Sequence, residues 1–295
     1  MTSVKGKSAL VTGAGSGINE GINLCFAKAL VAKGCNVLIA DLALRPEAKE
    51  FADANSSSVV FQKCDVTSWT DLTAAMAAAE KAFGAVDIVC PGAGVFEEPF
   101  SNFWIPPGSE GSVDNEAGSR YKLLDINLTH PIRLTQMAIA HFVARKKEGT
   151  IVCIASIAGQ LASLVTPMYI ASKWGVSGFV RSLELLEPKH GIRVAAVAPG
   201  LVRTPLFLDH PEKLRMIDEA KDDWVTPEEV ADAMVELVEK DEYVGGTILE
   251  VGHGQTRVVP LLNNPGPSGS GHTISGFGDA IDDVWQMMAG GNWTG

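Results

Sequence analysis

Short apolar segments alternate regularly with longer helical segments along this chain, and this order leaves few possible folds. Runs rich in Val and Ile, typical of strands buried on both faces, occupy residues 8–11, 36–40, 59–61, 86–90, 150–154, 192–197 and 247–251. Helical patterns lie between them, at residues 17–33, 68–83, 119–145, 168–186 and 227–239. This order predicts an α/β fold with a single doubly wound parallel sheet and helices on both faces. Ligands of such sheets bind beyond the carboxyl ends of the strands.

Composition and charge exclude several classes of protein. The 295 residues are 46% hydrophobic, which is enough for a large core, so the chain as a whole is not disordered. The net charge of −11 disfavours nucleic acid as a partner, because the phosphate backbone would be repelled. No apolar run approaches the ~18 residues that span a bilayer, and the first residues lack a signal-peptide core, so no membrane partner is expected.

The cysteines and histidines do not predict a disulfide framework or a metal site. The five cysteines are scattered, odd in number and without a C-x-x-C pair. Most lie in or beside strand-like segments, which indicates buried thiols in a reducing compartment and a cytoplasmic location. The six histidines lack metal-ligand spacing, so we expect no metal.

A glycine-rich turn follows the first predicted strand directly. Residues 12–19 place three glycines between a strand and a helix, where backbone N–H groups can approach a pyrophosphate. Asp41 ends the second predicted strand, 22 residues after Asn19, near the ~20 expected for a carboxylate that binds a ribose 2′-hydroxyl. The alternative for Asp41 is a turn or helix-capping residue. In this context the pattern predicts a Rossmann dinucleotide site.

The residues around this turn favour NAD over NADP. Neither Ser16 nor Leu42 supplies the positive charge that a 2′-phosphate needs. Arg45 is nearby, but Pro46 follows it, and we expect this pair to open the next helix.

A second group of residues indicates acid–base chemistry. Tyr169 and Lys173 are four residues apart at the start of a predicted helix, so they share one face. A tyrosine with a pKa near 10 exchanges protons poorly at neutral pH unless a neighbouring ammonium stabilises the phenolate. Ser156 ends the preceding strand and can hydrogen-bond a reacting oxygen. Taken alone, the Tyr/Lys pair is more often a plain surface pair.

Six motifs in order resemble the short-chain dehydrogenase/reductase family over residues 7–252. They are Thr12-Gly13-x-x-x-Gly17-Ile18, Asp65-Val66, Gly92-Ala93-Gly94, Asn127, Ser156 thirteen residues before Tyr169-x-x-x-Lys173, and Pro199-Gly200-Leu201-Val202-Arg203-Thr204. Two positions depart from the family pattern: Asn19 replaces the last glycine of the turn, and Pro91-Gly92 replaces two asparagines. The second change removes two amide side chains that the family pattern has beside the adenosine half of the cofactor.

The resemblance implies a role for each matching residue. Tyr169 is the acid or base, Lys173 lowers its pKa and holds the nicotinamide ribose, Ser156 orients the substrate oxygen, and Asn127 supports a proton relay. The cofactor-binding residues implied are Gly13, Ser16, Gly17, Ile18, Asn19, Asp41, Leu42, Asp65, Val66, Gly92, Ala93, Tyr169, Lys173, Pro199, Val202 and Thr204. The family also implies a homodimer or homotetramer, formed through the helices around Asn127 and after Tyr169.

The sequence therefore predicts an NAD(H)-dependent oxidoreductase that interconverts a largely apolar secondary alcohol and its ketone. The alternatives are an NADP-linked biosynthetic ketoreductase and a cofactor-binding regulator without turnover. Position beside the motifs suggests a substrate pocket, bounded by Val95, Phe96, Ala158, Thr166, Met168 and residues 201–214.

Two segments lie outside this plan. Residues 95–118 form a long polar connection, which is typical of a functional or mobile loop. Residues 1–252 are predicted to form the catalytic domain and 253–295 a C-terminal extension. Within it, residues 279–289 carry an apolar stripe of Ile281, Val284, Trp285 and Met288. We expect this helix to dock on its own or a neighbouring subunit, close to the active-site rim.

Overall fold

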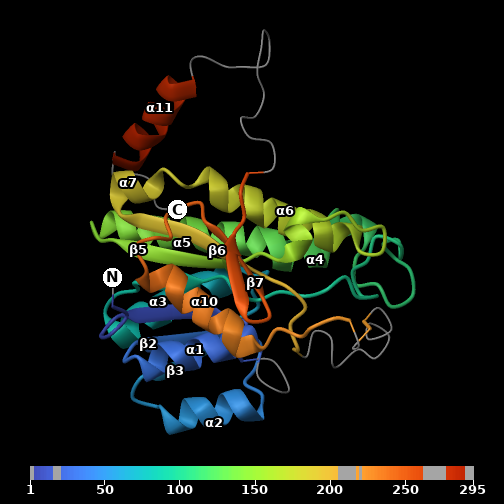
Figure 1. Cartoon of the computed structure of the whole chain (residues 1–295), viewed down its shortest axis with the longest axis horizontal. Helices are drawn as coiled ribbons and strands as arrows, with labels where there is room; N and C mark the ends of the chain where they lie inside the picture. Colours follow the sequence, from blue (N-terminus) through green and yellow to red (C-terminus); the bar gives the residue numbers. More distant parts are fainter. Residues whose placement is uncertain (1–2, 16–20, 205–216, 219–220, 262–276, 290–295) are drawn as a thin grey trace.

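The computed structural model describes residues 3–15, 21–204, 217–218, 221–261 and 277–289. They form one eight-stranded sheet with the order β3-β2-β1-β4-β5-β6-β7-β8 (Figure 1). The strands are β1 (Ser8–Thr12), β2 (Asn36–Asp41), β3 (Val59–Lys63), β4 (Ile88–Cys90), β5 (Gly149–Ile154), β6 (Ile192–Pro199), β7 (Ile248–Gly252) and β8 (Gln255–Val258). Strands β1 to β7 pair in parallel, and β8 pairs antiparallel with β7. The predicted doubly wound parallel sheet is confirmed.

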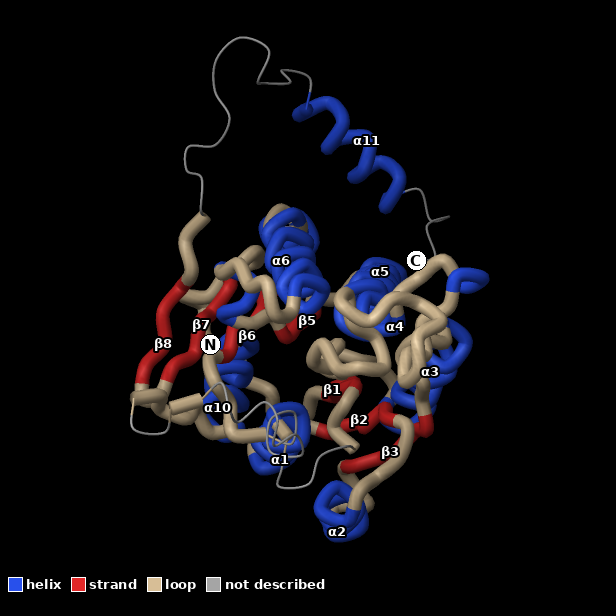
Figure 2. The backbone as a smooth tube through the Cα atoms, turned by 90° about the vertical axis from the view of Figure 1, so that its right-hand side faces the viewer, coloured by secondary structure: helices blue, strands red, loops and turns tan. Residues whose placement is uncertain are grey.

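Helices cover both faces of this sheet. They are α1 (Ile22–Ala32), α2 (Pro46–Ala54), α3 (Trp69–Phe83), α4 (Lys122–Leu124), α5 (His130–Ala144), α6 (Pro167–Ser182), α7 (Leu186–His190), α10 (Pro227–Glu239) and α11 (Phe277–Ala289). Figure 2 shows α1, α2 and α10 on one face and α3, α5 and α6 on the other. Short helical turns η1 (Glu116–Gly118), η2 (Asp125–Thr129) and η3 (Ile157–Gln160) lie among them. No helix within the described ranges is long and apolar enough to cross a membrane.

The central strands are apolar because both of their faces are covered. In β1, Val11 packs into the core beneath α1 and α10, whereas its neighbour Leu10 packs into the core beneath α3, α5 and α6. Alternate side chains of a strand point to opposite faces, so a strand between two helical layers needs apolar residues throughout. Polar side chains such as those of Thr12 and Asp41 lie at the ends of the strands, where the loops begin.

The structure departs from the sequence prediction in three elements. The helix predicted over 119–145 is interrupted, since a π-helical turn, η2, separates α4 from α5. The helix predicted over 168–186 ends at Ser182, and Leu186 lies in the separate helix α7, buried in the core of its own chain. Strand β8 was not predicted, because all of its residues are exposed and carry no apolar pattern.

The C-terminal helix α11 lies against α7 of the same chain. The ring of Trp285 is 5.5 Å from that of His190, and the Nζ of Lys189 is 5.9 Å from the Trp285 ring. Met288 is buried and packs with residues of the α5 and α6 core. Helix α7 leads into the amino end of β6, so this contact is at the end of the sheet opposite the active-site loops. Within one chain, the expected position near the active-site rim is therefore wrong.

Candidate active site

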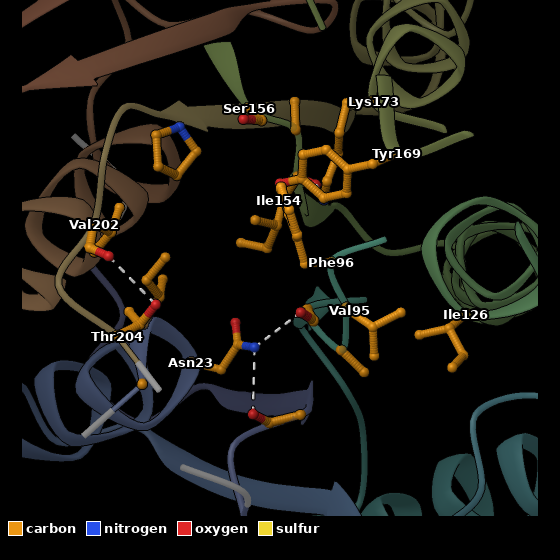
Figure 3. Close-up of a pocket in the computed structure, with 18 of the residues that line it drawn as sticks. Asn23, Val95, Phe96, Ile126, Ile154, Ser156, Tyr169, Lys173, Val202 and Thr204 are labelled. Carbon is orange, nitrogen blue, oxygen red and sulfur yellow. Dashed lines mark hydrogen bonds between the residues drawn. The ribbon is translucent and has the colours of Figure 1, made fainter. Parts of the chain in front are cut away.

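A cavity of about 570 Å³ opens at the carboxyl ends of the strands. Most of the site residues predicted from the sequence line it: Gly13, Asp41, Leu42, Asp65, Val66, Gly92, Ala93, Ser156, Tyr169, Lys173, Pro199, Val202 and Thr204. Ser16, Gly17, Ile18 and Asn19 lie outside the described residues. Figure 3 shows Ser156, Tyr169 and Lys173 gathered on one side of the cavity, with Asn23 across from them. The cavity thus brings together residues that are up to about two thirds of the chain apart.

Gly13 begins the turn after β1 in a conformation that favours glycine. Its φ is +77°, and a Cβ at this position would lie 2.6 Å from the Cα of Ala93. The turns after β1 and β4 therefore touch through their backbones, which a side chain at Gly13 would prevent.

Asn23 is a cavity residue that the sequence analysis missed. Its Nδ2 donates to the carbonyl oxygen of Gly92 at 2.9 Å and to that of Gly13 at 3.3 Å (Figure 3). A Cβ at Gly92 would overlap the Asn23 side chain, so the glycine makes room for it. Asn23 of α1 thus places an amide beside Gly92, one of the two positions at which the family pattern has asparagine. No local sequence pattern links Asn23 to Gly92, which lies 69 residues further along the chain.

Charged groups gather at the other end of the cavity. Asp41, at the end of β2, is buried, and its two oxygens accept hydrogen bonds from the N–H groups of Gly15 at 2.8 Å and Leu42 at 2.7 Å. Arg45, expected to open the next helix, also lines the cavity, and the NADP-linked alternative needs Arg45 or another cation to bind a 2′-phosphate. Its backbone indeed caps α2, with Pro46 as the first helical residue. This end therefore presents both an anion and a cation.

Two elements hold the three residues expected to perform the chemistry. Ser156 follows β5 and caps η3, where its Oγ accepts from the Ala158 N–H at 3.1 Å. Tyr169 and Lys173 lie on the first turns of α6, and the Lys173 Nζ is 5.5 Å from the centre of the Tyr169 ring. The same Nζ donates to the Ile154 carbonyl oxygen at 2.9 Å, which fixes the lysine beside β5.

Burial shifts the pKa values of this pair in opposite directions. It raises the pKa of the Tyr169 phenol, and a hydrogen bond with Ser156 only partly offsets that effect. Burial also lowers the pKa of Lys173 to about 8, so the amine is still largely protonated at neutral pH. The sequence analysis expected a lowered Tyr169 pKa. In the protein alone the pKa is raised, because loss of solvent around the phenolate outweighs the Ser156 hydrogen bond.

Asn127 does not line the cavity but lies directly behind it. It belongs to the π-helical turn η2, and its side chain pairs with the backbone of Val95 through two 2.8 Å hydrogen bonds. Its Nδ2 also lies 3.4 Å from the Ser172 Oγ on α6. Asn127 thereby connects the loop after β4 to the helix that carries Tyr169 and Lys173.

His130 is a buried residue beside the site to which the sequence analysis gave no role. Its Nε2 is 3.2 Å from the Thr12 Oγ1, and its Nδ1 is 3.2 Å from the Ile126 carbonyl oxygen. The Thr12 Oγ1 in turn accepts from the Ala93 N–H at 3.2 Å. Burial lowers the pKa of His130 to about 4, so the ring is neutral and links η2 to the turns after β1 and β4.

The side of the cavity around Tyr169 is apolar. Of the residues suggested for a substrate pocket, Val95, Phe96, Ala158 and Leu201 line the cavity, together with Ile154, Ile157 and Leu161. Thr166 and Met168 are buried without lining it, and residues 205–214 lie outside the described ranges. Across the described residues, no three His, Cys, Asp or Glu side chains gather as metal ligands would.

Comparison with known proteins agrees with this geometry. The family model described as short chain dehydrogenase matches residues 7–214. A (+)-borneol dehydrogenase 2 of Salvia officinalis is 31% identical over 268 residues, covering 85% of this chain and 89% of that protein. A cis-4-hydroxycyclohexanecarboxylate dehydrogenase of Sinomonas cyclohexanicum is 32% identical over 256 residues, covering 85% and 96%. An L-fucose dehydrogenase of Bos taurus is 31% identical over 207 residues, covering 70% of each. The chain belongs to the short-chain dehydrogenase family.

Proposed function

We propose that this protein is an NAD(H)-dependent oxidoreductase that interconverts a largely apolar secondary alcohol and its ketone. The observation that carries the proposal is the convergence of Ser156, Tyr169 and Lys173 on one apolar side of a cavity. The opposite end of the same cavity holds Asp41 and the glycine turn. Relatives whose names describe dehydrogenation of alcohols support the same reaction class.

The residues present fit a nicotinamide dinucleotide. Gly13, Gly92 and Ala93 offer backbone without bulky side chains in the middle of the cavity, and Asp41 offers a carboxylate for a ribose diol at one end. Lys173 and Thr204, which the family resemblance assigns to the nicotinamide half, also line the cavity. When bound, such a cofactor supplies or accepts the hydride.

The chain's own residues handle the proton and the substrate oxygen. In oxidation, the Tyr169 oxygen accepts the proton of the alcohol; in reduction, it donates a proton to the ketone oxygen. The Ser156 hydroxyl stabilises that oxygen through a hydrogen bond. The protonated Lys173 amine favours the phenolate form of Tyr169 by its positive charge. The raised pKa of Tyr169 in the protein alone means that the free enzyme holds the proton needed for reduction.

Asp41 favours NAD, because a 2′-phosphate would sit against its carboxylate. A second candidate is NADP-linked reduction, and the presence of Arg45 in the cavity wall is the observation that favours it. Steady-state assays of secondary alcohols and ketones with both cofactors decide between them. We expect kcat/KM to favour NAD; a tenfold preference for NADP would reject the NAD assignment.

The apolar wall around Tyr169 supports a substrate with few polar groups, such as an alicyclic alcohol. A screen of alicyclic and linear secondary alcohols against polyols, each with NAD, tests the substrate class. Polyols turned over with higher kcat/KM than alicyclic alcohols would refute it.

Assembly and location are also proposals. We propose a homodimer or homotetramer formed through α5 and α6, where Trp174 is 41% exposed on α6. Sedimentation at micromolar concentration should give a species of at least twice the 31.2 kDa chain mass, and a monomer would contradict the proposal.

The division of the chain and its location complete the proposal. Residues 1–252 would form the catalytic domain and 253–295 an extension. The five cysteines are all free and buried, which supports a cytoplasmic location.

A further inference from the structure

The N-terminus of helix α6 receives no hydrogen bond from the side chain of its own N-cap residue. Thr166 occupies the N-cap position, but its side chain makes no capping hydrogen bond. Pro167 has no N–H, so the first free donors of the helix belong to Met168 and Tyr169. A donor at this position needs an acceptor from elsewhere in the chain.

Glu97 supplies that acceptor from a loop 72 residues away. Its Oε2 accepts a hydrogen bond from the Tyr169 N–H at 2.9 Å, and its Oε1 accepts one from the Phe103 N–H at 3.0 Å. The Glu97 side chain is buried, with 5% of the residue exposed. A buried carboxylate is stable only when charge-assisted hydrogen bonds replace its water, and two backbone donors do so here.

The residues next to Glu97 contact the same catalytic groups. Val95 pairs with Asn127 through its backbone, and the ring of Phe96 is 4.8 Å from that of Tyr169. Three consecutive residues after β4 therefore hold Asn127, the Tyr169 ring and the Tyr169 backbone. The carboxylate also lies at a helix N-terminus, where the helix dipole favours a negative charge.

We infer that Glu97 is a positioning residue, which fixes the Tyr169 backbone and through it the phenol oxygen relative to the substrate. The inference rests on the proposed role of Tyr169 as acid or base. Proton and hydride transfer require reacting atoms within a few tenths of an ångström of the productive geometry, so a small shift of the first turn of α6 lowers the rate.

The test is Glu97→Gln in the full-length chain. Gln has the same shape but no charge and only one acceptor oxygen. One N–H therefore loses its acceptor, and the other keeps a bond that is weaker because it is no longer charge-assisted. We expect kcat, calculated from the concentration of protein that binds NADH, to fall at least fivefold. The Kd for NADH should stay within twofold of the wild-type value. The matched control is Glu110→Gln, which removes the same charge from an exposed position of the same loop and should leave kcat unchanged.

A purely structural role would lower the thermal midpoint of unfolding and leave kcat, calculated from the protein that binds NADH, unchanged. A fall in this kcat of less than fivefold overturns the inference. Amide hydrogen exchange at Tyr169 gives a readout that does not depend on activity: it should become faster in Glu97→Gln, and unchanged exchange also overturns the inference. If Glu97→Gln does not fold, Glu97→Asp, which keeps the charge but is one methylene shorter, takes its place under the same criteria.

Failure of the proposed function has a different signature. In that case the wild type turns over no alcohol or ketone with either cofactor, or Tyr169→Phe retains full activity. If instead the wild type is active and Tyr169→Phe is not, an unaffected Glu97→Gln refutes the positioning role alone.

Discussion

At the scale of single residues, the phenol of Tyr169 is the group on which the proposed reaction depends. It lies in the cavity wall with Ser156 and Lys173. Replacement by Phe removes the hydroxyl and keeps the ring that packs against Phe96. We expect Tyr169→Phe to lower kcat by ~10²–10⁴-fold, the usual effect of losing an acid–base group, and to leave NADH binding nearly unchanged. Steady-state kinetics and fluorescence titration measure the two quantities. More than a third of the wild-type kcat would assign the proton transfer to another residue.

His130 gives a second prediction at this scale, for stability as a function of pH. Its pKa is about 4 in the folded protein, below its ordinary value of 6.5, because burial disfavours the charged ring. The unfolded chain therefore binds a proton that the folded chain rejects between these pH values. The free energy of unfolding should therefore fall as the pH decreases from about 6.5 to about 4. Protonation of His130 in the unfolded chain should account for up to ~3 kcal/mol of this fall.

Urea unfolding at several pH values checks this expectation. The variant His130→Asn cannot titrate, so its free energy of unfolding should fall less steeply over this pH range than that of the wild type. Thr135→Val, at another fully buried polar position of α5 that does not titrate in this range, serves as the control and should keep the wild-type slope. Equal slopes for His130→Asn and the wild type would contradict the prediction.

At the scale of elements, the site depends on contacts between the turn after β1, helix α1 and the turn after β4. Asn23 joins all three through hydrogen bonds to Gly13 and Gly92. Each such bond contributes on the order of 1 kcal/mol, so its loss corresponds to about a fivefold change in an equilibrium constant. We expect Asn23→Ala to weaken NADH binding about five- to tenfold, because the glycine backbone beside the cofactor loses its support.

The control is Asn55→Ala. Asn55 also donates from Nδ2 to a backbone carbonyl, that of Phe51 at 2.9 Å, but it caps α2 and does not line the cavity. This variant should lose a similar amount of stability and keep the wild-type Kd. If both variants bind NADH as the wild type does, Asn23 has no part in shaping the cofactor site.

At the scale of the whole molecule, the C-terminal helix α11 adds buried surface far from the cavity. Met288 is buried in the α5 and α6 core, and Trp285 contacts His190 and Lys189 on α7. Deletion of residues 266–295 should therefore lower the melting temperature by a few degrees through lost apolar burial. It should leave kcat and KM unchanged, because no described residue of α11 lines the cavity.

A point variant separates this contact from the length of the tail. Trp285→Ala should reproduce most of the loss in melting temperature, whereas Met287→Ala, at a position that is 52% exposed, should not. Calorimetry measures both. A change in KM after the deletion would instead place the tail at an active site, within the chain or in a neighbouring subunit.

Features that depend on neighbouring residues were predictable from the sequence alone. Apolar β-branched runs predict buried strands, and glycines between strand and helix predict a tight turn. The spacing of Tyr169 and Lys173 places both on one helix face, as observed in α6. The carboxyl ends of parallel strands meet at one edge of the sheet, so these local patterns also predicted where a cavity would lie.

Features that depend on residues far apart in the chain are visible only in the folded structure. The hydrogen bonds of Asn23 with Gly92 and of Glu97 with Tyr169 span 69 and 72 residues, and no local pattern marks either pair. The exposed strand β8 forms because β7 offers an edge, not because its own residues are apolar. The raised pKa of Tyr169 likewise follows from burial, which depends on how distant segments pack around the side chain. Local sequence limits the conformations of neighbouring residues, whereas close packing of the folded chain determines which distant groups meet.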